Sequence, residues 1–246
     1  MKIGIIGAGN IGGALARKFV AAGHMVKLAG AKGPEEVREQ AEKIGATPVA
    51  STDAVKDVDV IILSIPFASI PDVSTLFADV PATVRVVDTS NYYPMRDQKI
   101  SDVEQGKPES VWTSEQLGRP VIKAFNAALA HTLAKNGQPQ GTPGRIAMPV
   151  AGDDTAGKEI VEQLVDEAGF DPVDAGTLAD SWRQQPGTPA YCTELPIDEL
   201  RQALAAADKD RAPGNRDAVM GEFMQATTPP THDHIIERNR AISAPR

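Results

Sequence analysis

The 246-residue sequence predicts an α/β fold, with a doubly wound, mostly parallel sheet, helices on both faces and a short helical C-terminal extension. Two observations support this prediction. Strand-like and helix-like segments alternate along the first part of the chain, and several strand-like segments are apolar at nearly every position. Strands that are apolar on both faces are typical of parallel sheets covered by helices.

The first segments follow this alternation closely. The run Lys2–Ile6 is rich in β-branched residues and stops at Gly7, which predicts a buried strand. Ile11–Ala22 repeats apolar residues at helical spacing and ends before Gly23, a residue that commonly terminates helices. Met25–Ala29 then predicts a second strand.

A second helix and further strands continue the pattern. Pro34–Ile44 is a charged helix with its proline in the first turn, where proline is tolerated, and Gly45 follows its end. The most strand-like segment of the chain is Val58–Ile65. Shorter strands are expected later, at Val84–Asp88, Val121–Phe125 and Ile146–Ala151.

The alternation ends near Asp180. This predicts one α/β domain over residues 1–180 and a C-terminal loop and helical extension over residues 181–246. Trp182–Thr193 is rich in Gln, Pro and Gly and is expected to be an ordered excursion, while Asp198–Lys209 is expected to be helical. After Thr227 the polar ending predicts a tail that is mobile or docked on a partner.

Composition limits the function classes. The chain has 25 Lys and Arg against 33 Asp and Glu, and a net charge of −8 argues against binding to nucleic acid or to an anionic membrane. Cys192 is the one cysteine, which excludes an intrachain disulfide and a multi-cysteine metal site. No apolar run approaches the roughly 18 residues of a membrane span. We therefore expect a cytoplasmic protein.

A glycine-rich turn, Gly7-Ala8-Gly9-Asn10-Ile11-Gly12, lies between the first strand and the first helix. In such a turn Gly7 permits the tight bend, Gly9 lets the backbone approach a pyrophosphate, and Gly12 permits close helix–strand packing. The N–H groups near Asn10 and Ile11 face the phosphates from the positive end of the helix. The alternative, a glycine turn that binds nothing, explains less of this placement. The motif predicts a Rossmann-type dinucleotide site.

The loop after the second strand indicates which dinucleotide is bound. It contains Gly30, Ala31 and Lys32, with no acidic residue before Glu35. A carboxylate here would bind the ribose hydroxyls of NAD, whereas a cation pairs with the 2′-phosphate of NADP. Lys32 therefore favours NADP, with Arg38 as a weaker second candidate and a solvated loop lysine as the alternative.

The loops after the next strands are expected to hold the reactive end of the cofactor and its acceptor. Only 11 aromatic residues occur in the chain, and four of them fall on these loops, namely Phe67, Tyr92, Tyr93 and Phe125. This clustering predicts a flat apolar pocket over the nicotinamide ring. The alternative is that individual aromatic rings fill the edge of the sheet.

No acid–base catalytic constellation and no metal site is evident. His24 and His131 are interpreted as structural, His232 and His234 lack further ligands, and Lys123 is a weak candidate for a proton donor. Hydride transfer between two redox-active rings depends more on orientation and the exclusion of water than on acid–base residues.

Several segments together resemble the NADPH-dependent reductases of the deazaflavin coenzyme F420 and their bacterial homologues. The resemblance covers roughly Met1–Pro189 and rests on MKIGIIGAGNIGGALARK, SIPFASIPDV, KAFNAALAH, VAGDDTAGKEIV and PVDAGTLADSWRQQPGTP. It implies a homodimer and a cofactor site made of Gly7, Gly9, Asn10, Ile11, Gly12, Gly30, Ala31, Lys32, Ser64, Ile65, Pro66 and Asn126. The family often has a Ser-Arg pair where this chain has Ala31 and Lys32.

The sequence therefore predicts an oxidoreductase that transfers a hydride between NADP(H) and a planar small-molecule acceptor, F420 or a flavin-like compound. The residues expected to contact the acceptor are Phe67, Asn91, Tyr92, Ala127 and Trp182. Trp182–Pro189 is expected to form a lid or a dimer contact. Two alternatives stay open: a reductase of a small carbonyl or imine, of the pyrroline-carboxylate or hydroxyacid type, and a non-catalytic module that senses NADPH.

Overall fold

A six-stranded, wholly parallel sheet forms the centre of the computed structural model, which describes residues 1–244. Its strand order is β3-β2-β1-β4-β5-β6. The strands are β1 (Lys2–Ile6), β2 (Met25–Ala29), β3 (Thr47–Pro48), β4 (Val60–Leu63), β5 (Arg85–Asp88) and β6 (Ile122–Lys123). This order is that of the doubly wound dinucleotide-binding fold, in which the order of the strands reverses between β1 and β4.

Alternation along the central strands divides the core in two. Ile3 and Ile5 of β1 lie opposite Val60 and Ile62 of β4 and point to one face, while Ile6 points to the other. Successive side chains of a strand face opposite sides, so a run that is apolar throughout buries both faces. The predicted parallel, two-faced sheet is confirmed.

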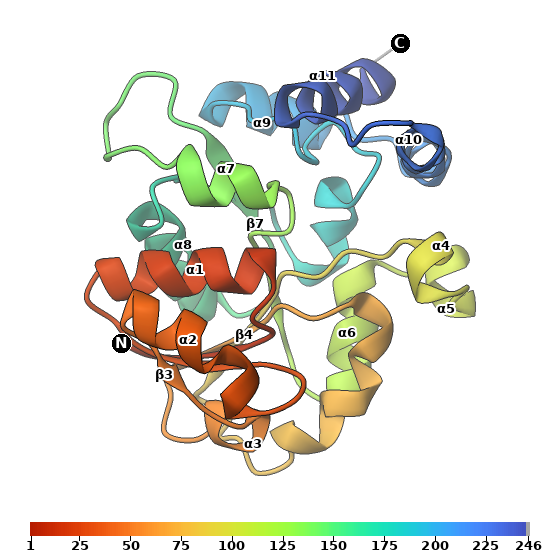
Figure 1. Ribbon diagram of the computed structural model, residues 1–246. Coiled ribbons are helices and arrows are strands. Elements are labelled where there is room, and N and C mark those ends of the chain that lie inside the picture. The colour runs from red at the N-terminus through yellow and green to blue at the C-terminus, as the bar shows by residue number, and fades with distance from the viewer. Residues whose placement is uncertain (245–246) are drawn as a thin grey trace.

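Helices cover both faces of this sheet (Figure 1). One face packs against α1 (Asn10–Ala21), α7 (Ala130–Lys135) and α8 (Thr155–Glu167), which contribute Leu15, Phe19, Leu133, Val161 and Leu164. The other face packs against the 3-10 helices η1 (Phe67–Ser69) and η2 (Pro71–Phe77) and against α6 (Glu109–Leu117). Four further helices lie around the sheet: α2 (Pro34–Ile44), α3 (Ser51–Ala54), α4 (Pro94–Asp97) and α5 (Ser101–Glu104).

A second, two-stranded parallel sheet joins β7 (Ala147–Val150) to β8 (Asp171–Asp174). An antiparallel bridge between Lys123 and Ala151 connects it to β6. The later predicted strands are present but shorter at their ends, since Val58–Ile65 becomes Val60–Leu63 and Val121–Phe125 becomes Ile122–Lys123. Some residues beyond these shorter bounds still bond to the neighbouring strand, since the Ser64 N–H donates to the Ile6 carbonyl at 2.8 Å.

Within the described residues, every secondary-structure element that follows β8 is a helix. The 3-10 helix η3 (Leu178–Gln184) leads to α9 (Ile197–Ala205), α10 (Ala212–Gln225) and α11 (His232–Ser243), which gather at one end of the molecule (Figure 1). The predicted helix Asp198–Lys209 corresponds to α9. Glycines interrupt the sequence of α10, which explains why its pattern did not predict a helix.

The C-terminal residues differ from the predicted mobile tail. Thr231 caps α11 by accepting the His234 N–H, and α11 packs against α10 with Ile236 buried. Arg238 of α11 also forms an ion pair with Glu222 of α10 at 2.6 Å. These contacts hold residues that look unstructured when the sequence is read locally. The last two residues of that predicted tail, 245 and 246, lie outside the described residues. No helix within residues 1–244 has the length and apolar character needed to cross a membrane.

Gly4 tests the packing of the central strand. A Cβ at this position would lie 1.8 Å from the Ala54 carbonyl oxygen. We expect Gly4→Ala to lower the free energy of unfolding by about 1–3 kcal/mol or more, because overpacking forces the backbone to shift. Gly221→Ala in α10 is the matched control, since a Cβ there meets no atom within 4 Å. Urea denaturation of both variants measures the difference, and equal stabilities would contradict the packing argument.

Candidate active site

Two adjoining cavities lie at the carboxyl ends of the central strands. The first, about 700 Å³, and the second, about 310 Å³, share Gly9, Ser64, Ile65 and Pro66 and so form one continuous groove. We call them the adenosine half and the acceptor half. Ligands of open α/β sheets bind at this edge, where the strand order reverses. The adenosine half is also lined by Ile6, Gly7, Ala8, Gly30, Ala31, Glu36, Val37, Gln40, Ser51, Ser69, Asp72 and Val73.

The glycine-rich turn forms the floor of the groove, and its three glycines do different things. Gly7 has a φ of +105°, and a Cβ there would lie 2.0 Å from the Ser64 carbonyl oxygen. A Cβ on Gly12 would lie 1.9 Å from the Gly7 carbonyl oxygen. Gly9, in contrast, has an ordinary φ of −68° and no atom within 4 Å of its Cβ position. The fold thus requires Gly7 and Gly12, whereas the space beside Gly9 is open to a ligand.

The N-terminus of α1 points into this groove without a cap. No side chain accepts a hydrogen bond from its first turn, and that turn has no acidic residue. Free N–H groups and the helix dipole together favour an anion there. Asn10 and Ile11 line the acceptor half, beside the open space at Gly9. The turn therefore fits the pyrophosphate of a dinucleotide, as the sequence predicted.

The structure adds a residue to the adenosine half that sequence reasoning missed. The Glu36 carboxylate accepts the Lys32 N–H at 2.8 Å and lies 2.6 Å from the position of a Cβ on Gly30. Glu36 is the third residue of α2, and glutamates there often reach back to preceding backbone N–H groups. That pattern, Gly33-Pro34-Glu35-Glu36, was the signal in the sequence.

The two cations predicted to bind a 2′-phosphate, Lys32 and Arg38, do not line the adenosine half, in contrast to Glu36. The Lys32 side chain is exposed, is absent from the lining of the adenosine half, and forms no ion pair within residues 1–244. Arg38 is engaged by Glu35 on the same helix, with Glu42 at 3.8 Å. Lys32 is thus available to a phosphate, while Arg38 is not placed for one.

Two amide side chains meet in the acceptor half. The Asn126 Nδ2 donates to the Asn91 Oδ1 at 3.0 Å and to the Gln184 carbonyl at 2.8 Å, and the Gln184 Nε2 donates to the Asn126 Oδ1 at 2.9 Å. Asn126 and Gln184 are almost wholly buried. The structure thus brings together the predicted Asn91, Asn126, Ile65 and Pro66 in one cavity. The other lining residues are Gly9, Asn10, Ile11, Ser64, Thr89, Ser90, Tyr93, Arg96, Phe125, Ala128, Leu129, Ala130 and Tyr191.

The predicted aromatic pocket over the nicotinamide is wrong for two of its four members, Phe67 and Tyr92, whereas Tyr93 and Phe125 do line the acceptor half. Phe67 and Tyr92 have no exposed surface, and Phe67 stacks on Trp112 with ring centroids 4.7 Å apart. Phe125 lines the groove but has its ring packed against Phe19 of the core. Large apolar rings gain more from complete burial than from lining an open groove. Phe67 and Tyr92 therefore cannot contact an acceptor in this structure.

Trp182 and Ala127 also lie outside the acceptor half. Trp182 lines a separate cavity of about 50 Å³, with the guanidinium of Arg183 and the amine of Lys209 over its ring. The carbonyl of Ala127 accepts the Cys192 N–H at 3.0 Å, and Ala127 does not line the cavity. Gln184 is fully buried beneath Asn126. The segment Trp182–Pro189 therefore supports the site from inside and does not form the predicted lid.

A buried charge network lies behind the acceptor half. The Lys123 ammonium, with no exposed surface, is 3.6 Å from Asp88 and 3.5 Å from Glu109, and it donates to the Ser90 carbonyl at 2.5 Å. Lys123 does not line the cavity, so the structure does not support its candidacy as a proton donor. Burial raises the pKa of Glu109 to about 7, against the opposing effect of Lys123. The network fixes the loop at Ser90, which does line the cavity.

The histidines are engaged elsewhere. His24 contacts Glu167, and His232 contacts Glu194 at 2.8 Å. Within residues 1–244 there is no group of three or more His, Cys, Asp or Glu residues that could hold a metal ion.

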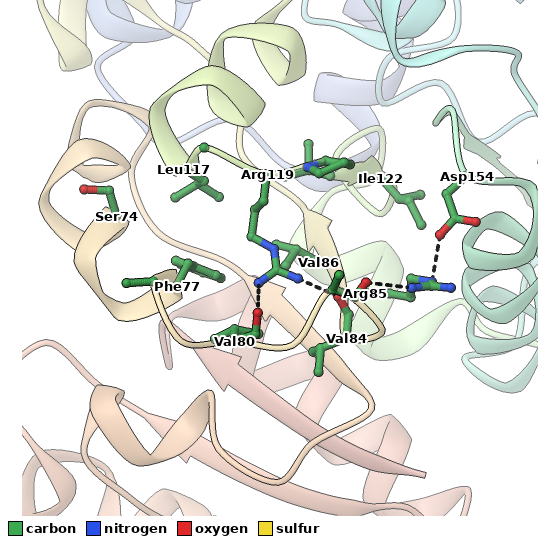
Figure 2. Close-up of a pocket in the computed structure, with 15 residues that line it drawn as sticks. Ser74, Phe77, Val80, Val84, Arg85, Val86, Leu117, Arg119, Ile122 and Asp154 are labelled. Carbon is green, nitrogen blue, oxygen red and sulfur yellow. Dashed lines mark hydrogen bonds and ion pairs between the residues drawn. The ribbon is translucent and has the colours of Figure 1, made fainter.

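A separate cavity of about 760 Å³ lies at the opposite edge of the sheet, at the amino ends of β5 and β6. Figure 2 shows Arg119 directed toward the Val80 carbonyl and Arg85 toward Asp154, at 2.8 Å. Both guanidinium groups already donate to backbone carbonyls, and that of Arg85 also pairs with the Asp154 carboxylate. We therefore assign the chemistry to the groove at the carboxyl ends of the strands and not to this separate cavity.

Gly9 separates binding from folding. We expect Gly9→Ala to weaken NADPH binding by at least tenfold, because the methyl group fills the space that a pyrophosphate needs. The free energy of unfolding should stay unchanged or rise by about 0.4–1 kcal/mol, since alanine restricts the unfolded chain. Titration calorimetry and urea denaturation check the two parts. Gly23 has a φ of +87° and lies outside the groove, so Gly23→Ala should show the reverse pattern.

Glu109 gives a pH-dependent test of the buried network. Its folded pKa, about 7, exceeds the ordinary value of 4.5, so the folded protein holds this proton more tightly than the unfolded chain. The resulting stability is complete below about pH 4.5 and is lost as the pH rises through 7. We therefore expect the free energy of unfolding of the wild type to fall across this window relative to Glu109→Gln. The exposed Glu39→Gln is the control, and a flat difference for both would contradict the assignment.

Comparison with known proteins agrees with this geometry. Residues 2–92 match the family model described as NADP oxidoreductase coenzyme F420-dependent. YjhV of Escherichia coli (strain K12) is 39% identical over 110 residues, which are 45% of this chain and 80% of YjhV. The crystal structure of the hypothetical protein SMa0349 from Sinorhizobium meliloti is 34% identical in sequence and has a TM-score of 0.70. The match covers 79% of this chain and 95% of the SMa0349 chain.

A proposed F420-dependent NADP reductase from Arthrobacter sp. FB24 shares the fold, with a TM-score of 0.62. It is 20% identical, and the match covers 74% of this chain and 87% of the Arthrobacter chain. At that identity the likeness is one of fold alone. From the family match, the related sequences and the dinucleotide groove, the chain belongs to the F420-dependent NADP oxidoreductases, a family of NAD(P)-dependent oxidoreductases.

Proposed function

We propose that this protein transfers a hydride between NADP(H) and a planar acceptor of the deazaflavin or flavin class, with coenzyme F420 as the first candidate. The observation that carries the proposal is the continuous groove. It runs from the β2–α2 loop across the open space at Gly9 to the fixed amides of Asn91 and Asn126. One half suits an adenosine and the other leaves room for two reacting rings.

The chain's own groups would act by positioning. The N–H groups at Gly9, Asn10 and Ile11 would hold the pyrophosphate at the uncapped start of α1. Ile65 and Pro66 form an apolar wall that excludes water, and Asn126, fixed by Gln184, would orient the carboxamide or the acceptor. When bound, the nicotinamide supplies the hydride. Holding two reactants in place can remove much of such a barrier without an acid–base residue.

Selection between NADP(H) and NAD(H) depends on two residues of opposite charge. Lys32 favours the 2′-phosphate, whereas the Glu36 carboxylate repels it and suits a ribose hydroxyl. Both side chains are exposed, so each interaction is screened by water. We therefore propose that the protein prefers NADPH to NADH by a modest factor, because Glu36 partly offsets the attraction of Lys32 for the 2′-phosphate.

The two charges can be separated by substitution. We expect Lys32→Ala to weaken NADPH binding by about 3- to 10-fold and to leave NADH binding within about twofold, because only NADPH carries the phosphate. Glu36→Gln should strengthen NADPH relative to NADH by about 2- to 5-fold. Dissociation constants for both cofactors measure these ratios. The exposed Glu39→Gln on the same helix is the control, and parallel changes for both cofactors in Glu36→Gln would contradict this role.

The proposed acceptor has a direct spectroscopic test. Purified protein is mixed with F420 and NADPH while the deazaflavin absorbance is followed, with NADH in a parallel sample. We expect bleaching with NADPH and slower bleaching with NADH. NADPH binding without bleaching would contradict F420 as the acceptor, and a screen of flavins, quinones and small carbonyls would follow. Binding without oxidation by any acceptor is what a non-catalytic NADPH sensor would show.

A second candidate function is the reduction of a small carbonyl or imine. The observation that favours it is a pair of tyrosine hydroxyls, Tyr93 and Tyr191, on the lining of the acceptor half. Such groups suit an acceptor whose oxygen or nitrogen must gain a proton. Turnover of a ketone or imine in that screen, in the absence of F420 turnover, would select this function.

A further inference from the structure

Two tyrosines that are 98 residues apart in the sequence meet in the acceptor half. The hydroxyl oxygens of Tyr93 and Tyr191 are 2.7 Å apart, and either one can be the donor. Both residues line the acceptor half together with Ile65, Pro66 and Asn126. Only one of the two phenolic hydrogens can lie between the oxygens. The other remains for a ligand, because no further nitrogen or oxygen partner of either hydroxyl occurs within residues 1–244.

The surroundings keep these phenols protonated. Burial raises the pKa of both Tyr93 and Tyr191 well above the ordinary value for a phenol. The neighbouring Cys192 thiol, a weak hydrogen-bond partner, is itself held neutral because burial raises its pKa to about 12. The Arg96 guanidinium lies 5.2 Å from the Tyr93 ring centre and lowers the pKa of this phenol, whereas the charge of Glu109 raises it. Both phenols are therefore protonated before an acceptor binds, so the pair has a hydrogen to donate and does not start as a base.

The acceptor half offers no competing donor of comparable acidity. Its lining contains no His, Asp, Glu, Lys or Cys, and Arg96 is its one other ionisable residue. The hydroxyls of Thr89 and Ser90 are already used, since they donate to the Leu63 carbonyl and to Asp88. The remaining lining hydroxyl, that of Ser64, is an aliphatic alcohol, which is intrinsically a weaker acid than a phenol. A proton delivered to a bound acceptor by a protein group would thus come from the tyrosine pair.

The backbone fixes the position of both rings. The Cys192 N–H donates to the Ala127 carbonyl at 3.0 Å, and Cys192 adopts a φ of +51°, which is strained for a residue other than glycine. On the other side, the Tyr93 N–H donates to Asp97 at 2.9 Å. The first bond connects the segment of Tyr191 to the loop after β6, and the second holds Tyr93 within its own loop.

We propose that the Tyr93–Tyr191 pair is the proton-donating group of the acceptor half, an inference that rests on the proposed hydride transfer. The acceptor class is a conjugated ring, carbonyl or imine whose reduction takes up one hydride and one proton. The bound nicotinamide is oxidised as its hydride bonds to a carbon of the acceptor. One tyrosine O–H bond breaks as an N–H or O–H bond forms on the conjugated nitrogen or oxygen. Water entering the groove returns the proton to the pair.

Three single substitutions test this role, because the chain has only three tyrosines. Tyr191→Phe and Tyr93→Phe each remove one hydroxyl of the pair. Tyr92→Phe is the control, since Tyr92 is buried in the core and, within residues 1–244, its hydroxyl bonds to the Gln98 carbonyl and the Ile100 N–H. NADPH and F420 are the substrates. We expect kcat to fall by about 10²-fold or more in the first two variants and to stay within about threefold in the control.

Two further measurements distinguish proton donation from damage to the fold. NADPH dissociation constants should stay within about twofold in all three variants. Oxidised F420 with NADP⁺, a mixture that cannot react, should bind about 2- to 10-fold more weakly to Tyr191→Phe, as expected for one lost hydrogen bond. Wild-type turnover should be slower in D₂O than in H₂O, and the ratio of the two rates should differ between the wild type and the two pair variants.

The possible failures differ from one another. If the wild type reduces F420 while both pair variants keep their rate and solvent isotope effect, the pair is not the donor and the hydride-transfer proposal stands. If the wild type reduces 9,10-phenanthrenequinone in place of F420, the same comparison with the quinone decides. If it binds NADPH and reduces neither of these compounds nor any flavin, ketone or imine of the screen, the proposed function and the donor role are both overturned.

Discussion

The groove depends on backbone contacts that only glycine permits. The end of β1 turns at Gly7 against the Ser64 carbonyl, and α1 leaves that turn with Gly12 against the Gly7 carbonyl. These two contacts bring the uncapped start of α1 to the carboxyl edge of the sheet, between the ends of β1 and β4. The open space at Gly9 is a result of that packing. The binding properties of the groove thus follow from how closely a helix and a strand approach each other.

The acceptor half depends on a different set of interactions, all of them polar and buried. Lys123 lies between Asp88 and Glu109 and holds the Ser90 carbonyl, while Gln184 holds the amide of Asn126. A buried polar network restricts its members to one arrangement only when nearly all of its hydrogen bonds are made. These groups do not have to touch a ligand to matter. They fix the loops whose Ser90 and Asn126 do line the groove.

The adenosine half shows a conflict between local structure and ligand preference. Glu36 stabilises the β2–α2 loop by accepting the Lys32 N–H, and Gly30 leaves the room for it. The same carboxylate is an unfavourable neighbour for a 2′-phosphate, which the Lys32 ammonium would attract. Family membership alone therefore does not determine how strongly this chain discriminates between the two dinucleotides.

The sequence by itself determined the parallel sheet, the order of its early helices and strands, and the glycine-rich turn, because these features depend on residues that are close together in the chain. It also predicted that Asn91, Asn126, Ile65 and Pro66 lie together, and the structure brings them into one cavity, since parallel strands end at one edge. It could not place aromatic residues: whether Phe67 or Tyr92 faces a groove or the core depends on partners such as Trp112, from another element. The helix α11 was missed for a similar reason, because its stability comes from packing on α10. Only the tertiary structure decided that Tyr93 and Tyr191 meet, because the contact joins segments 98 residues apart and leaves no periodic pattern in the sequence.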